Sequence, residues 1–121
     1  MNQVTIRVRD LERSIGFYSR LGLDLIVKND HYARFVVPGN QATLSLDLSP
    51  NPEPCSTTIY FEHENLDAWV SELSKTGIEI LAGPVNQPWL WREAYLLDPD
   101  GHRICLYYAG ENRLNPPWKI Q

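Results

Sequence analysis

Residues 3–26, QVTIRVRDLERSIGFYSRLGLDLI, and residues 58–81, TIYFEHENLDAWVSELSKTGIEIL, decide the fold of this chain of 121 residues. The two stretches align without a gap at a shift of 55 positions. Each opens with alternating polar and apolar residues, which is typical of a strand with one buried face. Each continues with a helix N-cap residue and an acidic first turn, and each predicted helix ends at a glycine, Gly22 or Gly77. The repeat therefore predicts one β-α-β unit that is present twice.

Each copy also has two further runs of alternating apolar residues, which we expect to be strands; they cover residues 31–37, 42–48, 92–97 and 103–108. The sequence Asp98-Pro99-Asp100-Gly101 predicts the turn between the last two. The residues that follow Gly83-Pro84 are expected to be irregular. Eight strands and two helices predict an α+β fold, in which two βαβββ modules form a curved eight-stranded sheet with the helices outside and a central cleft.

The length favours a single domain over residues 1–121, because two independent domains of half this size would each be marginally stable. The proline-rich stretch Ser49-Pro50-Asn51-Pro52-Glu53-Pro54 ends just before the repeat restarts and is typical of a linker. The predicted parts are module one at about 1–49, the linker at about 50–55, module two at about 56–108 and a C-terminal tail at 109–121.

Charge and hydropathy exclude several classes of function. The net charge is −4 and the isoelectric point is about 5.3, with no basic stripe, so nucleic-acid binding is not expected. The sequence has neither a long apolar segment nor a basic and apolar leader, and we expect a cytoplasmic protein that does not enter membranes. In a reducing compartment Cys55 and Cys105 should remain unpaired.

Strand alternation assigns the side chains that would line the cleft. If Val4, Ile6 and Val8 pack under a helix, the residues between them point into the cleft. Applied to all strands, this reasoning gives a set of candidate ligand-binding residues with aromatic rings and charged anchors: Arg7, Arg34, Tyr60, Trp91, Tyr95 and Tyr107. Such a composition suits a planar or amphipathic ligand. The alternative is that the aromatic rings fill a closed core.

Glu93 is the candidate catalytic residue. A partly buried carboxylate beside Trp91 and Tyr95 could serve as a general base. The alternative is an ion pair with Arg7 or Arg34. The three histidines are expected at the surface or in turns, where they make local hydrogen bonds.

Two motifs carry a resemblance to a known family. The opening Val8-Arg9-Asp10-Leu11-Glu12-Arg13-Ser14, with Phe17-Tyr18 and Leu21-Gly22-Leu23 after it, and the closing Leu97-Asp98-Pro99-Asp100-Gly101-His102-Arg103-Ile104 resemble the vicinal oxygen chelate superfamily. This superfamily contains glyoxalase I, fosfomycin-resistance proteins, extradiol dioxygenases and bleomycin-resistance proteins. The resemblance covers nearly the whole chain and implies the fold and a homodimer, but it does not select an activity.

The resemblance places the metal ligands of the family's enzymes, commonly His, His or Gln, and Glu, at Gln3, Thr58 and Cys105. Gln3 could supply a neutral oxygen ligand, but a threonine hydroxyl is a poor ligand for a divalent ion. A thiolate at Cys105 could hold zinc, but it does not suit magnesium, manganese or ferrous ions. We therefore expect neither a family-type metal centre nor another cofactor, and Cys105 is expected to be a packing residue.

These observations predict a small-molecule-binding protein of the sequestration or resistance type, similar to the bleomycin-resistance branch. The alternative is a metal-dependent lyase, isomerase or dioxygenase that uses a modified site with Gln3 and Glu93, or metal-free acid-base chemistry. A third possibility is an interaction module with a filled cleft. The tail, with Asn115-Pro116-Pro117-Trp118, is expected to dock either on a second subunit or on its own sheet.

Overall fold

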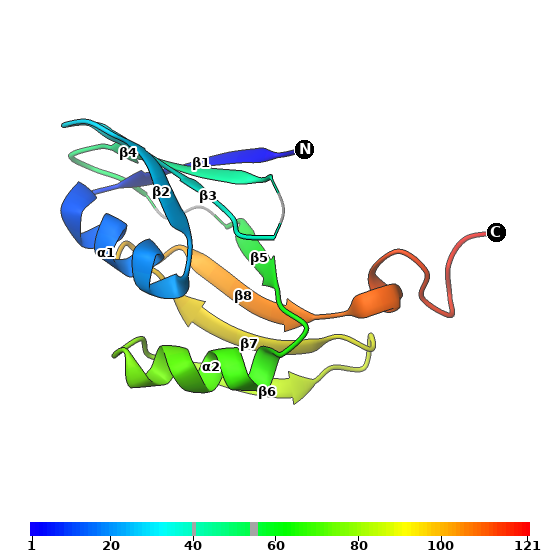
Figure 1. Ribbon diagram of the computed structural model, residues 1–121. Coiled ribbons are helices and arrows are strands. Elements are labelled where there is room, and N and C mark those ends of the chain that lie inside the picture. The colour runs from blue at the N-terminus through cyan, green and yellow to red at the C-terminus, as the bar shows by residue number, and fades with distance from the viewer. Residues whose placement is uncertain (40, 54–55) are drawn as a thin grey trace. The chain divides into compact units, whose positions relative to one another are not determined.

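The computed structural model describes residues 1–39, 41–53 and 56–121, and Figure 1 shows its elements. Their bounds are β1 Gln3–Val8, α1 Leu11–Leu21, β2 Asp24–Lys28, β3 Tyr32–Val36, β4 Thr43–Leu48, β5 Thr58–Glu62, α2 Leu66–Lys75, β6 Ala82–Asn86, β7 Arg92–Leu97, β8 Arg103–Tyr108 and the 3-10 helix η1 Gly110–Arg113. The predicted two βαβββ modules are confirmed, and their strands form two four-stranded sheets. The chain divides into two compact units, residues 1–55 with 98–102 and residues 56–97 with 103–121.

The first sheet has the strand order β1-β4-β3-β2, with β1 parallel to β4 and the other pairs antiparallel. Ile6 and Val8 are buried on the face that α1 covers, as strand alternation predicts (Figure 1). The helix begins after Asp10, whose side chain accepts a hydrogen bond from the Arg13 backbone N–H at 3.1 Å. It ends at Gly22, whose φ of 110° lies in the left-handed region that favours glycine.

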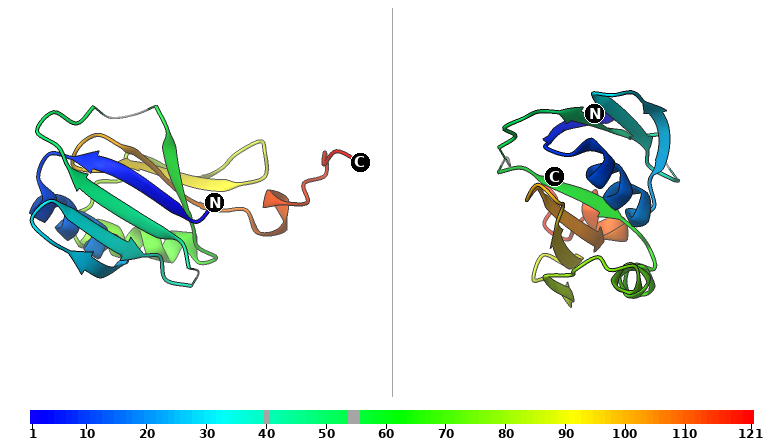
Figure 2. Two further views of the ribbon diagram at one scale, coloured as in Figure 1. Left: turned by 90° about the horizontal axis from the view of Figure 1, so that it is seen from above. Right: turned by 90° about the vertical axis from the view of Figure 1, so that its left-hand side faces the viewer.

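The second sheet repeats this arrangement in the order β5-β8-β7-β6. On one face α2 contacts β8 and β6, and the right-hand view of Figure 2 looks along this helix. Leu66, Val70 and Leu73 are its buried residues, whereas Trp69 is half-buried and stacks on His63 with ring centroids 5.2 Å apart. Within the described residues, no helix has both the length and the apolar composition needed to span a bilayer.

The prediction for the third element of the second module is wrong. The repeat predicts a strand over 78–81 and irregular structure after Gly83-Pro84, but β6 runs from Ala82 to Asn86. Its pairing with β7 shifts register between Ala82 and Val85. An edge strand tolerates this interruption because half of its backbone groups need no partner within the sheet, so a proline without an N–H costs little there.

The predicted turn at residues 98–101 forms and is anchored within the first unit. Asp98 is buried, and its Oδ2 accepts a hydrogen bond of 2.7 Å from the Tyr18 hydroxyl. Asp100 accepts a hydrogen bond from the Arg9 backbone N–H at 3.1 Å. His102, which was expected at the surface or in a turn, is buried at 3 % exposure, with its Nε2 2.8 Å from the Arg7 carbonyl oxygen. The turn motif is therefore part of the core of this unit.

Candidate functional site

One face of the second sheet carries most of the candidate residues. Residues that pair directly in a sheet share a face, and the register pairs Tyr60 with Cys105 and Cys105 with Tyr95. It likewise pairs Tyr107 with residues of the two neighbouring strands. We call this the aromatic face; it comprises Tyr60, Glu62, Trp91, Glu93, Tyr95, Cys105 and Tyr107.

Three rings of the aromatic face form a cluster. Trp91 stacks on Tyr107 with centroids 4.8 Å apart and planes inclined by 21°. Tyr60 meets both rings edge-on, at 6.1 Å from Trp91 and 5.5 Å from Tyr107. Tyr107 is buried at 7 % exposure, whereas Tyr60 is 48 % exposed and Trp91 is half-buried. The buried Tyr107 thus supports the cluster, while the exposed parts of Tyr60 and Trp91 leave ring surface on which a flat ligand can stack.

Glu93 lies at the edge of this cluster and is 1 % exposed. Its carboxylate accepts a hydrogen bond of 2.9 Å from the Trp89 indole N–H and another from the Tyr95 hydroxyl. Both donors are neutral groups, so they do not compensate the negative charge of the Glu93 carboxylate. Sequence reasoning missed Trp89, which lies in the turn before β7, where strand alternation does not apply.

On the aromatic face, burial keeps the thiol and the tyrosine hydroxyls protonated at neutral pH. Burial, followed by the charge of Glu93, raises the pKa of the Cys105 thiol to about 12. Burial is also the main cause that raises the pKa of Tyr60, Tyr95 and Tyr107 above the ordinary tyrosine value. The phenols are therefore neutral, and Cys105 is a protonated, fully buried packing residue. Cys55 lies outside the described residues.

Arg7 and Arg34 belong to the other unit. They lie with polar neighbours on the face of the first sheet opposite α1, which we call the polar face; it comprises Gln3, Thr5, Arg7, Asp24, Tyr32, Arg34, Thr43, Ser45 and Asp47. Arg34 Nε donates a hydrogen bond of 2.9 Å to the Tyr32 hydroxyl oxygen, which is 2.5 Å from Ser45 Oγ. The structure thus brings the aromatic candidates and Glu93 together and places the two arginines on the polar face of the other unit. Alternation placed Ser45 on this face, but nothing in the sequence signalled its central role.

The first part of the predicted tail docks on its own sheet. The Glu62 carboxylate accepts hydrogen bonds from the backbone N–H groups of Ala109 and Gly110 at 2.8 and 3.0 Å. Trp91 Nε1 donates to the Asn112 carbonyl oxygen at 3.4 Å. The segment beyond η1 extends away from β8 and exposes 58 % of Trp118 (Figures 1 and 2). Residues 109–113 of the predicted tail therefore dock on the chain's own sheet.

The three positions at which the family would bind a metal do not offer a suitable donor set. The Gln3 amide oxygen accepts a hydrogen bond from the Thr43 hydroxyl, and its Nε2 donates to Ser45 Oγ at 2.9 Å. Thr58 supplies a neutral hydroxyl, and a thiol with a pKa of about 12 at Cys105 resists the deprotonation that metal binding needs. In the part of the chain that the structure describes, no three His, Cys, Asp or Glu side chains converge. These residues do not fit a family-type metal centre.

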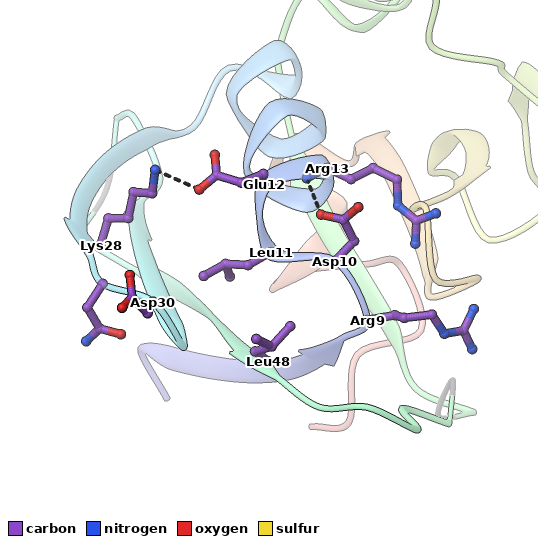
Figure 3. Close-up of a pocket in the computed structure, with 9 residues that line it drawn as sticks. Arg9, Asp10, Leu11, Glu12, Arg13, Lys28, Asp30 and Leu48 are labelled. Carbon is purple, nitrogen blue, oxygen red and sulfur yellow. Dashed lines mark hydrogen bonds and ion pairs between the residues drawn. The ribbon is translucent and has the colours of Figure 1, made fainter.

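A hollow of about 750 Å³ opens beside the N-terminus of α1 (Figure 3). Leu11 and Leu48 point into it, and charged side chains surround them. Most of these charges are already satisfied, because Lys28 pairs with Glu12 at 2.7 Å, Arg13 pairs with Asp100 at 3.5 Å and Asp10 caps the helix. Among the described residues that line it, the hollow therefore presents no converging set of free polar groups, and we do not assign chemistry to it.

Residues 1–106 match the Glyoxalase/Bleomycin resistance protein/Dioxygenase superfamily. The chain belongs to this superfamily. Among curated relatives, the metallothiol transferase FosB of Lysinibacillus sphaericus is 30 % identical over 110 residues, which cover 86 % of this chain and 78 % of FosB. The FosB of Staphylococcus saprophyticus is 29 % identical over 113 residues, which cover 88 % of this chain and 75 % of that protein.

Solved structures of other proteins show the same fold. An integron cassette protein from the mobile metagenome of the Halifax Harbour sewage outfall superposes with a TM-score of 0.79 at 24 % identity, over 89 % of this chain and 97 % of the other. A bleomycin-binding protein complexed with bleomycin superposes with a TM-score of 0.73 at 21 % identity, over 89 % of this chain and 96 % of that one. At these identities the likeness concerns the fold alone.

Proposed function

We propose that this superfamily member is a small-molecule-binding protein of the sequestration or resistance type, whose aromatic face holds a planar or amphipathic ligand. The observation that carries the proposal is the stack of Trp91 on Tyr107 with the partly exposed Tyr60 beside it. Rings that already support one another lose little conformational freedom when a flat ligand stacks on them. The buried charge of Glu93 favours a ligand that carries a positive or hydrogen-bond-donating group.

Binding of this kind needs no family-type metal, and the chemistry of the Gln3, Thr58 and Cys105 side chains supports its absence. We further propose that the protein is a cytoplasmic homodimer, as the family resemblance implies. Sedimentation equilibrium measures the oligomeric state: a mass of about twice 13.9 kDa is expected, and a monomer at micromolar concentration contradicts it.

A titration of tryptophan fluorescence tests the ligand proposal. The probes are metal-free bleomycin, the ligand of the bleomycin-binding protein with the same fold, and the smaller planar cation 9-aminoacridine, both in the presence of EDTA. We expect saturable quenching by at least one probe and a loss of at least about tenfold in affinity in Trp91→Ala. Trp118→Ala, which removes an exposed indole of the tail, is the matched control and should change the affinity by less than about twofold. Failure of both probes to saturate, or unchanged affinity in Trp91→Ala, contradicts the proposal.

The names of the curated relatives favour a second candidate, an enzyme of the superfamily with a modified site. In this version Glu93 acts as a general base, after a substrate group displaces the Trp89 indole from its carboxylate. Mass spectrometry of the recovered probe distinguishes the two candidates. Sequestration returns the probe unchanged, whereas an enzyme converts it at a rate that Glu93→Gln reduces.

A further inference from the structure

The polar face of the first sheet contains a hydrogen-bond chain that the proposed function does not use. Gln3 Nε2 donates to Ser45 Oγ at 2.9 Å, and Ser45 Oγ lies 2.5 Å from the Tyr32 hydroxyl oxygen. Arg34 Nε donates to the same Tyr32 oxygen at 2.9 Å, with its guanidinium carbon 5.4 Å from the centre of the tyrosine ring. The Tyr32 hydroxyl is thus contacted by Ser45 of β4 and by Arg34 of its own strand β3.

The burial of Ser45 fixes the direction of the protons along this chain. Ser45 is 0 % exposed and already accepts a hydrogen bond from Gln3, so its own hydroxyl hydrogen needs an acceptor. Among the described residues, the Tyr32 oxygen is the acceptor within reach. The opposite arrangement, in which Tyr32 donates to Ser45, would leave a buried hydroxyl hydrogen unsatisfied. Ser45 is therefore the donor.

It follows that the Tyr32 oxygen accepts from Ser45 and from Arg34, and that its own phenolic hydrogen points out of the network. Tyr32 and Arg34 are only half-buried, so a ligand can reach this hydrogen and the terminal amino groups of Arg34. The hydrogen bond from Ser45, followed by that from Arg34, lowers the pKa of Tyr32, while burial and the charge of Asp47 act in the opposite direction. The group is thus a strengthened hydrogen-bond donor.

The donors and the charges of the two faces select the kind of ligand group. On the polar face Arg7 and Arg34 are balanced by Asp47 and by Asp24, which pairs with Val36, and the Tyr32 O–H and the Arg34 guanidinium remain as donors. The aromatic face of the second sheet carries instead the carboxylates of Glu62 and Glu93, which disfavour an anion. An anionic group therefore finds its donors on the polar face.

We propose that Tyr32 and Arg34 form a binding site for the oxyanion of a small organic acid, such as a carboxylate or a phosphonate. The Tyr32 O–H and the Arg34 guanidinium donate to the oxyanion, and Ser45 and Gln3 position the phenol. This site uses residues of the first unit and none of the aromatic face, so the proposal does not depend on ligand binding there.

An NMR titration of the full chain with ¹³Cζ-labelled tyrosine tests the site. The probes are methylphosphonate and acetate, which carry no ring to stack on the aromatic face, with tetramethylammonium as the cationic comparison. We expect a saturable shift of the Tyr32 resonance with at least one of the two anions and a higher pKa of Tyr32 at saturation, because a bound anion disfavours the phenolate. The cation should produce no saturable shift of this resonance.

Variants separate recognition from folding. Arg34→Gln should weaken anion binding at least about tenfold while Tyr32 still reports it, and Tyr32→Phe should weaken it similarly when binding is followed by calorimetry. Arg9→Gln removes the same charge from a side chain that extends away from α1 in the same unit (Figure 3), and it should change the affinity less than about twofold. The proposal is overturned if neither anion shifts Tyr32 saturably, if the cation binds equally well, or if Arg34→Gln retains full affinity. Trp91 fluorescence reports the aromatic face independently, so the two proposals can fail separately.

Discussion

Removal of the Tyr18 hydroxyl tests how the turn at residues 98–101 is held in the first unit. Tyr18 is 0 % exposed, and its hydroxyl donates a 2.7 Å hydrogen bond to Oδ2 of Asp98, which is itself buried at 5 % exposure. The other carboxylate oxygen, Oδ1, accepts from the backbone N–H groups of Asp100 and His102, each at 2.9 Å. In Tyr18→Phe, Oδ2 loses this donor, while the ring and its packing on Phe35 are kept.

The expected cost follows from the burial of both partners. A hydrogen bond to a charged group contributes roughly 1.5–3 kcal/mol, and the carboxylate oxygen left behind cannot reach bulk water. Unfolding of a chain of this length has an entropy of roughly 0.25 kcal/mol per kelvin, so each kcal/mol lowers Tm by about 4 °C. Tyr18→Phe should therefore lower the free energy of unfolding by about 1.5–3 kcal/mol and Tm by about 6–12 °C.

Urea denaturation followed by far-ultraviolet circular dichroism measures the change. Tyr108→Phe, at a 43 % exposed tyrosine, is the control and should alter stability by less than about 0.5 kcal/mol. A double-mutant cycle with Asp98→Asn isolates the pair and should give a coupling of at least about 1 kcal/mol. The reasoning is refuted if Tyr18→Phe costs no more than the control, or if the two substitutions are additive.

Three further predictions concern the second unit. In a Cys55→Ser background, Cys105 should react with iodoacetamide at pH 8 about a thousandfold more slowly than a thiol with the ordinary pKa of 9.0, because its pKa is raised to about 12; comparable rates contradict this. The contribution of the Cys105 thiol and the Tyr95 phenol to folding stability should be fully present below about pH 9 and fall as the pH rises further, because the unfolded chain releases these protons at their ordinary pKa values while the folded chain retains them; a stability that rises from pH 9 to 11 in chemical denaturation contradicts it. Gly83→Ala should cost about 1–3 kcal/mol, because the new Cβ would overlap the backbone carbonyl oxygen of Glu93 at a φ of 83°. Gly16→Ala, in a helix and with open space around it, should instead stabilise by about 0.5–1 kcal/mol, and equal effects at the two glycines contradict the account.

The fold was predictable from periodicity because each strand and helix buries apolar side chains at regular intervals along its sequence. The alternation of β1 is reproduced directly in the burial of Ile6 and Val8, and the buried residues of α1 recur at helical spacing. The prediction failed at β6, where Gly83 and Pro84 interrupt the pattern although an edge strand tolerates them. Periodicity also did not predict the burial of His102, which follows from the packing of the turn in which this residue was expected.

The candidate site was predictable only as far as alternation reaches. The shared face of Tyr60, Tyr95 and Tyr107 follows from strand register. The hydrogen bond from Trp89 to Glu93 comes from a turn, whose course a one-dimensional pattern does not specify. The central place of Ser45 in the polar network likewise depends on how three strands pair, which the sequence of any one strand does not contain.

Metal analysis of the protein, purified without chelator, tests most directly whether this superfamily member works by binding alone. Inductively coupled plasma mass spectrometry should find well below one zinc, nickel, manganese or iron ion per chain, because Thr58 and Cys105 offer a hydroxyl and a protonated thiol in place of strong ligands. One tightly held ion per chain, lost in Thr58→Ala or Cys105→Ala, would contradict the account.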